Sequence, residues 1–377
     1  MGAQLDSLFL SCGETSGDQY ASVLVKALRD EGFTGRIWGM VGPESTGSGV
    51  EAKWSMDELR LMGISEVLGA IPRLFRLKKE IAEKILAERP AAVVVIDSPD
   101  FHLPLLSSIR KLGYRGKVVY LCPPTVWAWR VSRTKKLKRL CDLCLPLFEF
   151  EHTFLLNHGV RSKWSGHPLK GCLDGFCPEQ NPGNHLAGKT VVGLLPGSRP
   201  AEITRLLPPL LEAGRRLQED GYYPLLSLAP FLPEKTRRFV RKSAPDFDIY
   251  EGPGTRVLAV SSAVAGASGT LAVEALIMKT FMVVLYKASF SSSLAYKLFV
   301  KTPWISIPNI LAGEELFPEF LQGEATAGNI LHGLKTYLED QECRERAKTL
   351  MEKTALELGK KCAVRDWARS ILKEIAL

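Results

Sequence analysis

The segment VVGLLPGSRPAEITRLLPPLLEA, residues 191–213, has the pattern of a buried strand, a short loop and a helix. Residues 191–195 form an apolar run of the kind found in strands covered on both faces. Residues 196–199, Pro-Gly-Ser-Arg, end this run, and apolar side chains then recur at helical spacing. Pro200 suits a first helical turn, and Glu202 suits the positive end of the helix dipole.

This loop has the features of an anion-binding site. The backbone amides of Gly197 and Ser198 precede a helix, where unpaired N–H groups attract negative charge, and Arg199 adds a fixed cation. The alternative is an ordinary turn within a strand–helix–strand unit. One loop of this type does not decide between the two interpretations.

Length and composition indicate a folded protein with two domains. The chain has 377 residues, of which 46% are hydrophobic and 24% are charged. Its formal net charge of +8 favours an anionic partner, such as a phosphorylated substrate, a membrane surface or nucleic acid. No stretch of about 20 residues is apolar enough for a transmembrane helix, and the N-terminus lacks a signal-peptide pattern. We therefore expect a cytoplasmic protein.

A second small-residue loop lies at the start of the chain. Residues 7–12 are predicted to form a strand, and Gly-Glu-Thr-Ser-Gly-Asp follows at residues 13–18. This sequence does not match the dinucleotide-binding fingerprint. A small-residue loop at the end of a strand still marks the ligand-binding edge of an α/β sheet. Glu14 is therefore either a turn carboxylate or a substrate contact.

A third strand is predicted to lead to candidate acid–base residues. The β-branched run at residues 91–96 has the pattern of a central parallel strand. Asp97, Asp100 and His102 follow it, and a general base is commonly placed at such a strand end. Asp97 is also well suited to a turn or a helix cap, so Asp100 and His102 remain the candidates for the base.

Residues 63–79 combine apolar side chains with arginine and lysine. Such a segment suits either a buried helix with a basic edge or a surface that contacts anionic lipid headgroups. We predict a lipid-facing patch ringed by Arg73, Arg76 and Lys78. The membrane-facing residues are expected to be Val67, Leu68, Ile71, Leu74 and Phe75, together with Leu206 and Leu207.

The second half of the chain repeats the arrangement of strand, small-residue loop and helix. Residues 264–267 lead to Ser268, Gly269 and Thr270, and Glu274 lies one turn inside the following helix. Glu274 is either a partner of the helix dipole or a carboxylate that accepts the two hydroxyls of a ribose. We predict an α/β fold with two Rossmann-like domains facing across a cleft. The expected domains are residues 1–173 and 189–345, with a linker at 174–188 and a C-terminal helix at 346–377 that packs on the first domain or swaps with a second copy.

Several stretches together resemble one family, the bacterial lipid-A-disaccharide synthases, which are glycosyltransferases of the GT-B type. Each stretch is modest by itself, but the set occurs in the family's order over nearly the whole chain. The stretches are GETSGD at 13–18, IDSPDF at 96–101, VWAWR at 126–130, LPGSR at 195–199, ASGT at 267–270 with Glu274, and PNILAG at 308–313 with LQ at 321–322.

The resemblance implies transfer of 2,3-diacylglucosamine from UDP to 2,3-diacylglucosamine 1-phosphate, which yields the β(1→6) disaccharide and UDP. Asp100 matches the family's proposed general base, and Glu14 matches a residue whose loss impairs activity. Arg199, Glu274 and Asn309 match residues that hold UDP, and Gln322 belongs to the same cluster. The resemblance also implies a peripheral protein on the cytoplasmic surface of the inner membrane, and it leaves a homodimer open.

Asp97 and Asp100, at the predicted site, are separated by two residues, so they do not form the Asp-x-Asp pair that holds a divalent ion under a sugar diphosphate. We therefore expect no metal ion and no other cofactor, with fixed cations and helix dipoles in their place.

Four positions depart from the family pattern. His102 stands where Asn is usual, Pro123 where Ser is common, Gly171 where Asp often occurs, and Glu314 where Arg often follows the PNILAG stretch. Glu314 matters most because it places an acid near the expected diphosphate site.

Two competing functions remain open. One is another UDP-sugar enzyme of the GT-B type, such as an epimerase or a transferase to a soluble acceptor. The other is a nucleic-acid-binding protein that uses the basic run between Arg130 and Arg139. No base-stacking platform or groove-reading module accompanies this run, so we expect no nucleic-acid partner.

Overall fold

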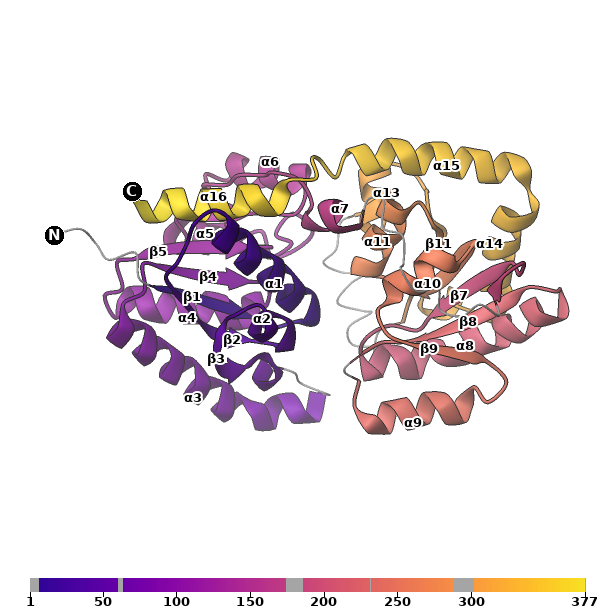
Figure 1. The fold of residues 1–377 in the computed structure, drawn as a ribbon, viewed down its shortest axis with the longest axis horizontal. Helices are drawn as coiled ribbons and strands as arrows, with labels where there is room; N and C mark the ends of the chain where they lie inside the picture. The colour runs from indigo at the N-terminus through magenta and orange to yellow at the C-terminus, as the bar shows by residue number, and fades with distance from the viewer. Residues whose placement is uncertain (1–6, 60–63, 174–185, 231, 288–301, 377) are drawn as a thin grey trace. The chain divides into compact units, whose positions relative to one another are not determined.

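A computed structural model of the chain describes residues 7–59, 64–173, 186–230, 232–287 and 302–376. The chain divides into two compact units (Figure 1). Unit 1 consists of Met1–Gly171 and Leu358–Leu377, and unit 2 consists of Cys172–Glu357. Each unit is built around its own sheet, and both sheets are entirely parallel.

The sheet of unit 1 has six strands in the order β3-β2-β1-β4-β5-β6. Its strands are β1 (Ser7–Cys12), β2 (Arg36–Val41), β3 (Glu51–Ser55), β4 (Ala92–Ile96), β5 (Lys117–Leu121) and β6 (Leu143–Leu145). Its helices are α1 (Thr15–Asp30), α2 (Pro43–Gly47), η1 (Met56–Leu59), α3 (Ile64–Glu88), α4 (Pro99–Lys111), α5 (Arg133–Leu140), α6 (Glu149–Asn157), α7 (Pro168–Leu173), which ends just past the unit boundary, and α16 (Ala363–Ala376).

The sheet of unit 2 also has six strands, in the order β12-β11-β10-β7-β8-β9. Its strands are β7 (Val191–Leu195), β8 (Tyr223–Leu228), β9 (Asp248–Glu251), β10 (Ala263–Ala267), β11 (Phe281–Tyr286) and β12 (Glu319–Leu321). The helices among its described residues are α8 (Pro200–Glu219), α9 (Glu234–Ser243), α10 (Gly254–Val260), α11 (Thr270–Met278), α13 (Ile307–Ala312), η3 (Gln322–Glu324), α14 (Ala327–Glu339) and α15 (Gln341–Leu356).

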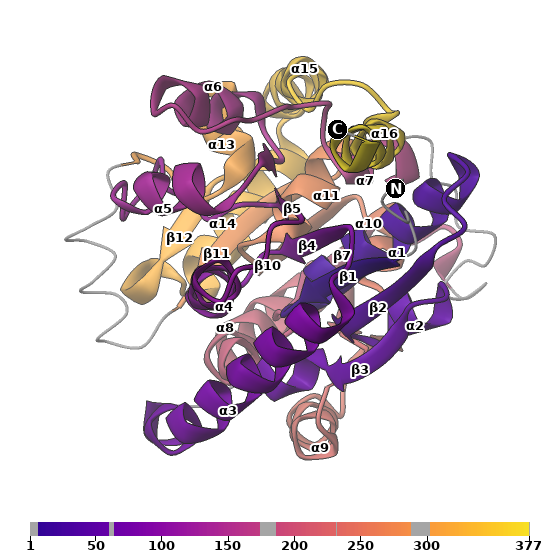
Figure 2. The same cartoon turned by 90° about the vertical axis from the view of Figure 1, so that its left-hand side faces the viewer.

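Helices cover both faces of the sheet in unit 1 (Figure 2). Alternation along each strand assigns side chains to one face or the other. Leu8 and Leu10 belong to the core that α1 and α16 cover, whereas Phe9 belongs to the core that α3 and α4 cover. Because both faces are covered by helices, the central strands are continuous apolar runs. The predicted α/β class is confirmed.

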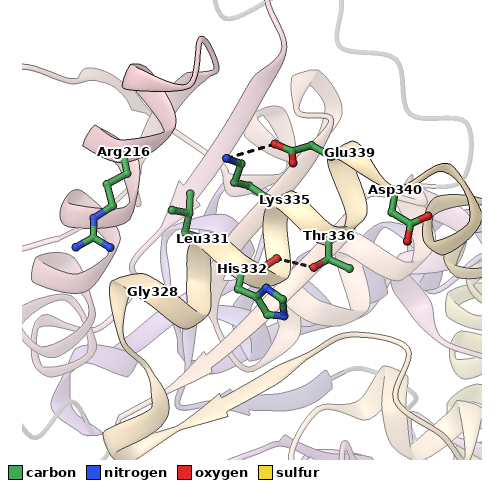
Figure 3. A pocket seen from close by; sticks show the side chains of 8 residues that line it. All are labelled: Arg216, Gly328, Leu331, His332, Lys335, Thr336, Glu339 and Asp340. Carbon is green, nitrogen blue, oxygen red and sulfur yellow. Dashed lines mark hydrogen bonds and ion pairs between the residues drawn. The ribbon is translucent and has the colours of Figure 1, made fainter.

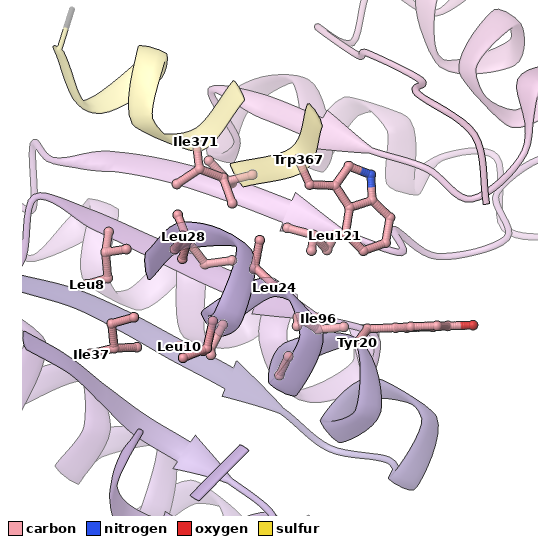
Figure 4. Close-up of a cluster of buried hydrophobic side chains, with 14 of the residues drawn as sticks. Leu8, Leu10, Tyr20, Leu24, Leu28, Ile37, Ile96, Leu121, Trp367 and Ile371 are labelled. Atoms are coloured by element: carbon pink, nitrogen blue, oxygen red, sulfur yellow. The ribbon is translucent and has the colours of Figure 1, made fainter. Parts of the chain in front are cut away.

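The last helix of the chain completes the core of unit 1. Trp367 of α16 is fully buried and meets the ring of Tyr20 edge to face, with ring centroids 6.2 Å apart (Figure 4). At the end of the same helix, Glu374 forms an ion pair with Arg161 at 2.6 Å. The C-terminal region therefore contains two helices, α15 in unit 2 and α16 in unit 1, where the sequence suggested one.

The predicted lipid-facing role of Leu206 and Leu207 is wrong. Both side chains are only 1% exposed, on the face of α8 that packs against β8, β10 and α14. The helical spacing of the apolar residues in α8 directs that face into the core of unit 2, so it is not available to a membrane.

Replacement of Trp367 by Ala tests whether α16 belongs to the core of unit 1. Loss of a fully buried tryptophan leaves a cavity, so we expect the free energy of unfolding to fall by about 3–5 kcal/mol. Urea unfolding followed by far-UV circular dichroism measures this change. Replacement of Leu356, which is 71% exposed, by Ala is the control and should change stability by less than about 0.5 kcal/mol. Equal unfolding midpoints for W367A and the wild type would contradict the assignment.

Candidate active site

The predicted anion-binding loop of unit 2 lies at the carboxyl end of β7. Gly197 has a φ of 113°, and a Cβ at this position would lie 2.6 Å from a carboxylate oxygen of Glu202, so glycine is required. Oε2 of Glu202 accepts a hydrogen bond from Ser198 N–H at 3.3 Å, and Oε1 accepts one from Arg199 at 2.9 Å. The loop therefore already holds a negatively charged group between its amide and its arginine.

The second predicted loop lies beside the first. Leu195 of β7 pairs with Gly266 of β10, so the loops that follow these strands leave the same edge of the sheet. A Cβ on Gly197 would lie 3.2 Å from the Cβ of Ala267, immediately before the Ser268–Thr270 loop. Gly269 is the N-cap of α11 and has a φ of 141°. The chain progresses in opposite directions across the sheet from β7 and β10, which makes this edge a topological switch point.

Glu274 lies one turn into α11, behind this edge. Its carboxyl group is half-buried, and this burial raises its pKa to about 7. A carboxylate in such an environment gains from hydroxyl donors that supply the hydrogen bonds lost with water.

Asn309 was predicted to hold a nucleotide, and its amide is fully buried in unit 2. Its Oδ1 accepts hydrogen bonds from the N–H groups of Leu316 and Phe317, at 3.0 and 2.8 Å. Its Nδ2 donates to the carbonyl of Phe317 at 2.8 Å and to Glu319 at 2.9 Å. The side chain thus ties α13 to the start of β12.

Gln322 and Glu314 occupy different places around this region. Gln322 directly follows β12 and has a left-handed φ of 52°. It therefore lies on the same carboxyl edge as the two loops, beyond β11. Glu314, the acid that departs from the family pattern, forms an ion pair with Arg346 of α15 at 3.2 Å.

Unit 1 has its own switch point, between β1 and β4. Asp97 at the end of β4 accepts a hydrogen bond from Gly13 N–H at the end of β1, at 3.1 Å. A Cβ on Gly17 would lie 1.9 Å from Asp97, so the loop needs glycine at this position. Burial raises the pKa of Asp97 to about 7, and the negative charge of Glu14 also raises it. Asp97 is thus the residue that joins the two loops, and Glu14 lies next to it as the exposed N-cap of α1.

The prediction of His102 as an alternative base is wrong. Its ring is fully buried, and Nδ1 donates to the carbonyl oxygen of Asp97 at 2.8 Å. Nε2 therefore accepts a hydrogen bond from Ser11, also at 2.8 Å. Burial lowers the pKa of His102 to about 4, so the ring is neutral and serves to hold the backbone of Asp97.

Asp100, the predicted base, is the second residue of α4, and its side chain is 75% exposed. Its Oδ1 accepts hydrogen bonds from Arg130, at 3.2 Å, and from Arg133. Both arginines belong to the basic run of the sequence, but their link to Asp100 was not predicted. Asp100 lies thirty residues before Arg130 in the sequence, so no local sequence pattern indicates that these two residues form a pair.

A buried carboxylate supports the loop that carries Arg130. Trp127 donates its indole N–H to Glu151 at 2.8 Å, and Glu151 also accepts from the backbone N–H of Phe148 at 3.3 Å. Burial raises the pKa of Glu151 to about 7. Sequence reasoning missed Glu151, because its position after a strand suggests only the start of a helix.

A surface groove between α8 and α14 lies away from the switch point of unit 2 (Figure 3). It is lined by Arg216, His332 and Lys335, among others. Arg216 lies in the last turn of α8, about 24 Å along the helix from the loop at its first turn. The groove is therefore separate from the predicted nucleotide site.

Replacement of His102 by Asn tests whether the histidine is a neutral core residue. In the unfolded chain the imidazole of His102 binds a proton below pH 6.5, whereas in the folded protein it does so only near pH 4. Stability of the wild type should therefore fall by about 3 kcal/mol more than that of H102N between pH 6.5 and 4. Urea unfolding measures the difference in free energy of unfolding between the wild type and H102N, which should not change with pH above pH 7. If this difference also stays constant down to pH 4, the assignment is contradicted.

Comparison with known proteins extends over both units. A family model described as lipid-A-disaccharide synthetase matches residues 8–374. The lipid-A-disaccharide synthase of Pseudomonas paraeruginosa is 36% identical over 339 residues, covering 88% of this chain and 89% of the relative. That of Anaeromyxobacter dehalogenans is 32% identical over 389 residues, covering 97% of both chains.

Solved structures with the same fold share little sequence with this chain. Staphylococcus aureus MnaA, solved with UDP, has a TM-score of 0.66 at 15% identity and covers 97% of this chain and 95% of its own. The UDP-GlcNAc 2-epimerase of Methanocaldococcus jannaschii, solved with UDP-GlcNAc and UDP, has a TM-score of 0.65 at 13% identity and covers 97% and 99%. The predicted GT-B type of fold, with two Rossmann-like domains, is confirmed. Together with the family match over nearly the whole length, these findings establish that the chain belongs to the lipid-A-disaccharide synthetase family, whose members are glycosyltransferases.

Proposed function

We propose that this protein transfers 2,3-diacylglucosamine from its UDP derivative to the 6-hydroxyl of 2,3-diacylglucosamine 1-phosphate. The products are the β(1→6)-linked disaccharide 1-phosphate and UDP. The family match from residue 8 to residue 374 is the observation that carries this proposal. The two switch-point edges, one in each unit, support it, because they would supply the groups that the reaction needs.

We assign UDP to the switch point of unit 2. The N–H groups of Gly197 and Ser198, the guanidinium of Arg199 and the start of α11 at Ser268–Thr270 would bind the diphosphate. The position of Glu202, between the amide of Ser198 and Arg199, supports this assignment because a negative group is accommodated there. Glu274 would accept the ribose hydroxyls.

Asn309 and Gln322 complete the assigned site at its far side. Asn309 would act by holding the segment between α13 and β12 in place, through the four hydrogen bonds that its amide makes. Gln322 follows β12, the strand to which that segment leads.

We assign the acceptor and the base to unit 1. Because an α-linked donor gives a β-linked product, the reaction is a single displacement with inversion. The 6-hydroxyl oxygen of the acceptor forms the new bond to C1 of the donor while its proton passes to Asp100, and the bond between C1 and the phosphate oxygen of UDP breaks. The leaving diphosphate carries the electron pair away, and its charge is stabilised by the donors of unit 2.

Glu14 lies next to Asp97, whose pKa its negative charge raises, and we assign it a role in the acceptor site. We also propose that the reaction needs no metal ion, because fixed cations and helix N-termini would stabilise the leaving diphosphate. The assays below therefore include EDTA, and loss of wild-type activity in EDTA would contradict metal independence.

Variants of Asp100 and Arg199 separate catalysis from nucleotide binding. D100A should lose about 10²–10⁴-fold in turnover with little change in UDP affinity, because a positioned base contributes that much to the rate. R199A should bind UDP about 10–100-fold more weakly, because it loses charge-assisted hydrogen bonds. Isothermal titration with UDP and a UDP-release assay measure the two effects.

The matched control for R199A is R205A, which removes an exposed arginine of the same helix. It should leave UDP affinity unchanged. Normal turnover of D100A would place the base elsewhere, and normal UDP binding by R199A would remove the proposed diphosphate site.

We also propose that α3 of unit 1 contacts the cytoplasmic surface of the inner membrane, where acylated substrates are found. Ile71 and Phe75 are 40% and 61% exposed, and Lys78 lies 4.7 Å from the centroid of the Phe75 ring. Exposed apolar side chains with adjacent cations suit an anionic lipid surface.

Val67 and Leu68 lie on the same helix, but their side chains are outside the described residues, and Leu74 is half-buried. Within the described residues, no helix combines the length and the apolar character needed to cross a bilayer.

Replacement of Ile71 and Phe75 by Ser should weaken binding to vesicles that contain anionic lipid by about tenfold or more, because each side chain loses its apolar burial. Sedimentation with vesicles measures the bound fraction. L112S is the control, because Leu112 of unit 1 is 59% exposed but lies outside α3. Equal sedimentation of the wild type and the double variant would contradict a membrane role for α3.

A further inference from the structure

Aromatic and cationic side chains form a cluster around Asp100. Arg130, in the segment between β5 and α5, and Arg133, the first residue of α5, both donate to Oδ1 of Asp100. The guanidinium of Arg130 lies 4.1 Å from the centroid of the Trp129 ring, and that of Arg133 lies 5.8 Å from it. Stacking on an aromatic face holds the plane of a guanidinium in place. Asp100 therefore lies against two preoriented arginines.

The two arginines differ in what they can offer a ligand. The side chain of Arg133 is 13% exposed, whereas that of Arg130 is 49% exposed. A guanidinium has five N–H donors. Within the described part of the chain, the acceptor found for Arg130 is Oδ1 of Asp100. Arg133 is thus suited to hold the carboxylate, and Arg130 is suited to hold the carboxylate and a second anion.

The backbone of Arg130 supports a functional role for this residue. Its φ of 52° is left-handed, a conformation that a non-glycine residue adopts at an energetic cost. Arg133 N–H donates to the carbonyl of Arg130 at 2.9 Å, which closes the turn that directs both side chains to Asp100. Residues with such an unfavourable backbone conformation are common where the fold positions a side chain for a ligand.

The charge around the cluster is positive. One carboxylate faces two arginines, and α5 continues with Lys135, Lys136, Lys138 and Arg139 and contains no acidic residue. Arginine recognises tetrahedral oxyanions such as phosphate by paired hydrogen bonds. A phosphomonoester is therefore the class of ligand that this cluster fits.

We propose that Arg130 binds the phosphate group of the acceptor sugar while Arg133 positions the carboxylate of Asp100. This proposal rests on the proposed function, in which the acceptor is a sugar 1-phosphate that reacts through its 6-hydroxyl. Both ends of that molecule are then held in unit 1, the phosphate by Arg130 and the reacting hydroxyl by Oδ2 of Asp100. The cluster accordingly selects acceptors that carry a phosphate at C1.

The test compares two acceptors, 2,3-diacylglucosamine 1-phosphate and the methyl glycoside of the same sugar, which lacks the phosphate. The wild type should prefer the phosphorylated acceptor in kcat/KM. R130A should lose about 10–100-fold in kcat/KM for that acceptor, mainly through KM, and change little for the methyl glycoside. R133Q should instead lower kcat for both acceptors alike, because it disturbs the base.

R139A is the matched control, because it removes an exposed arginine of the same basic run, within α5, and should treat both acceptors as the wild type does. The urea unfolding profile of R130A, followed by far-UV circular dichroism, verifies that unit 1 of the variant is folded, and its UDP affinity, measured by titration, verifies that unit 2 is intact. An equal loss for both acceptors in R130A would overturn the proposal, since Arg130 would then act only through Asp100. If the wild type forms no disaccharide from either acceptor, the proposed function itself fails, and the proposal fails with it.

Discussion

Where the chain leaves two adjacent parallel strands toward opposite sides of a sheet, no connection covers the carboxyl edge between those strands. Both units depend on this constraint. In unit 1 the edge lies between β1 and β4, and in unit 2 it lies between β7 and β10. At each edge a glycine permits close approach: Gly17 lies against Asp97, and Gly197 lies against Ala267. The candidate base and the candidate diphosphate loop each follow one of these strands.

Much of the fold could be predicted from the sequence because the relevant signals are local. The apolar runs at Ala92–Ile96 and Val191–Leu195 each consist of consecutive residues, so neighbouring residues alone indicate a buried strand. The structure has strands at both places. Asp97, Ser98 and Gln322 have left-handed backbone conformations and lie just after strands, at the carboxyl edges of the two sheets. Small residues and carboxylates that follow a predicted strand can be read from the sequence, so they indicated where a site could form.

The remaining features depend on contacts between residues far apart in the sequence. His102 next to two carboxylates suggests a base, but Ser11 and the backbone of Asp97 use both of its ring nitrogens. Leucines at helical spacing identify an apolar face, but only the packing of α8 shows that Leu206 is buried. In the same way, the basic run gave no indication that Arg130 and Arg133 meet Asp100.

The central claim is that the carboxylate of one unit activates an acceptor for a sugar held by UDP in the other. The most direct measurement incubates the purified protein with UDP-2,3-diacylglucosamine and 2,3-diacylglucosamine 1-phosphate, and follows UDP and the anomeric linkage by NMR. The account predicts one UDP for each β-linked disaccharide, with no reaction of the sugar nucleotide when the acceptor is omitted. An epimerised sugar nucleotide formed without acceptor, or an α-linked product, would contradict it.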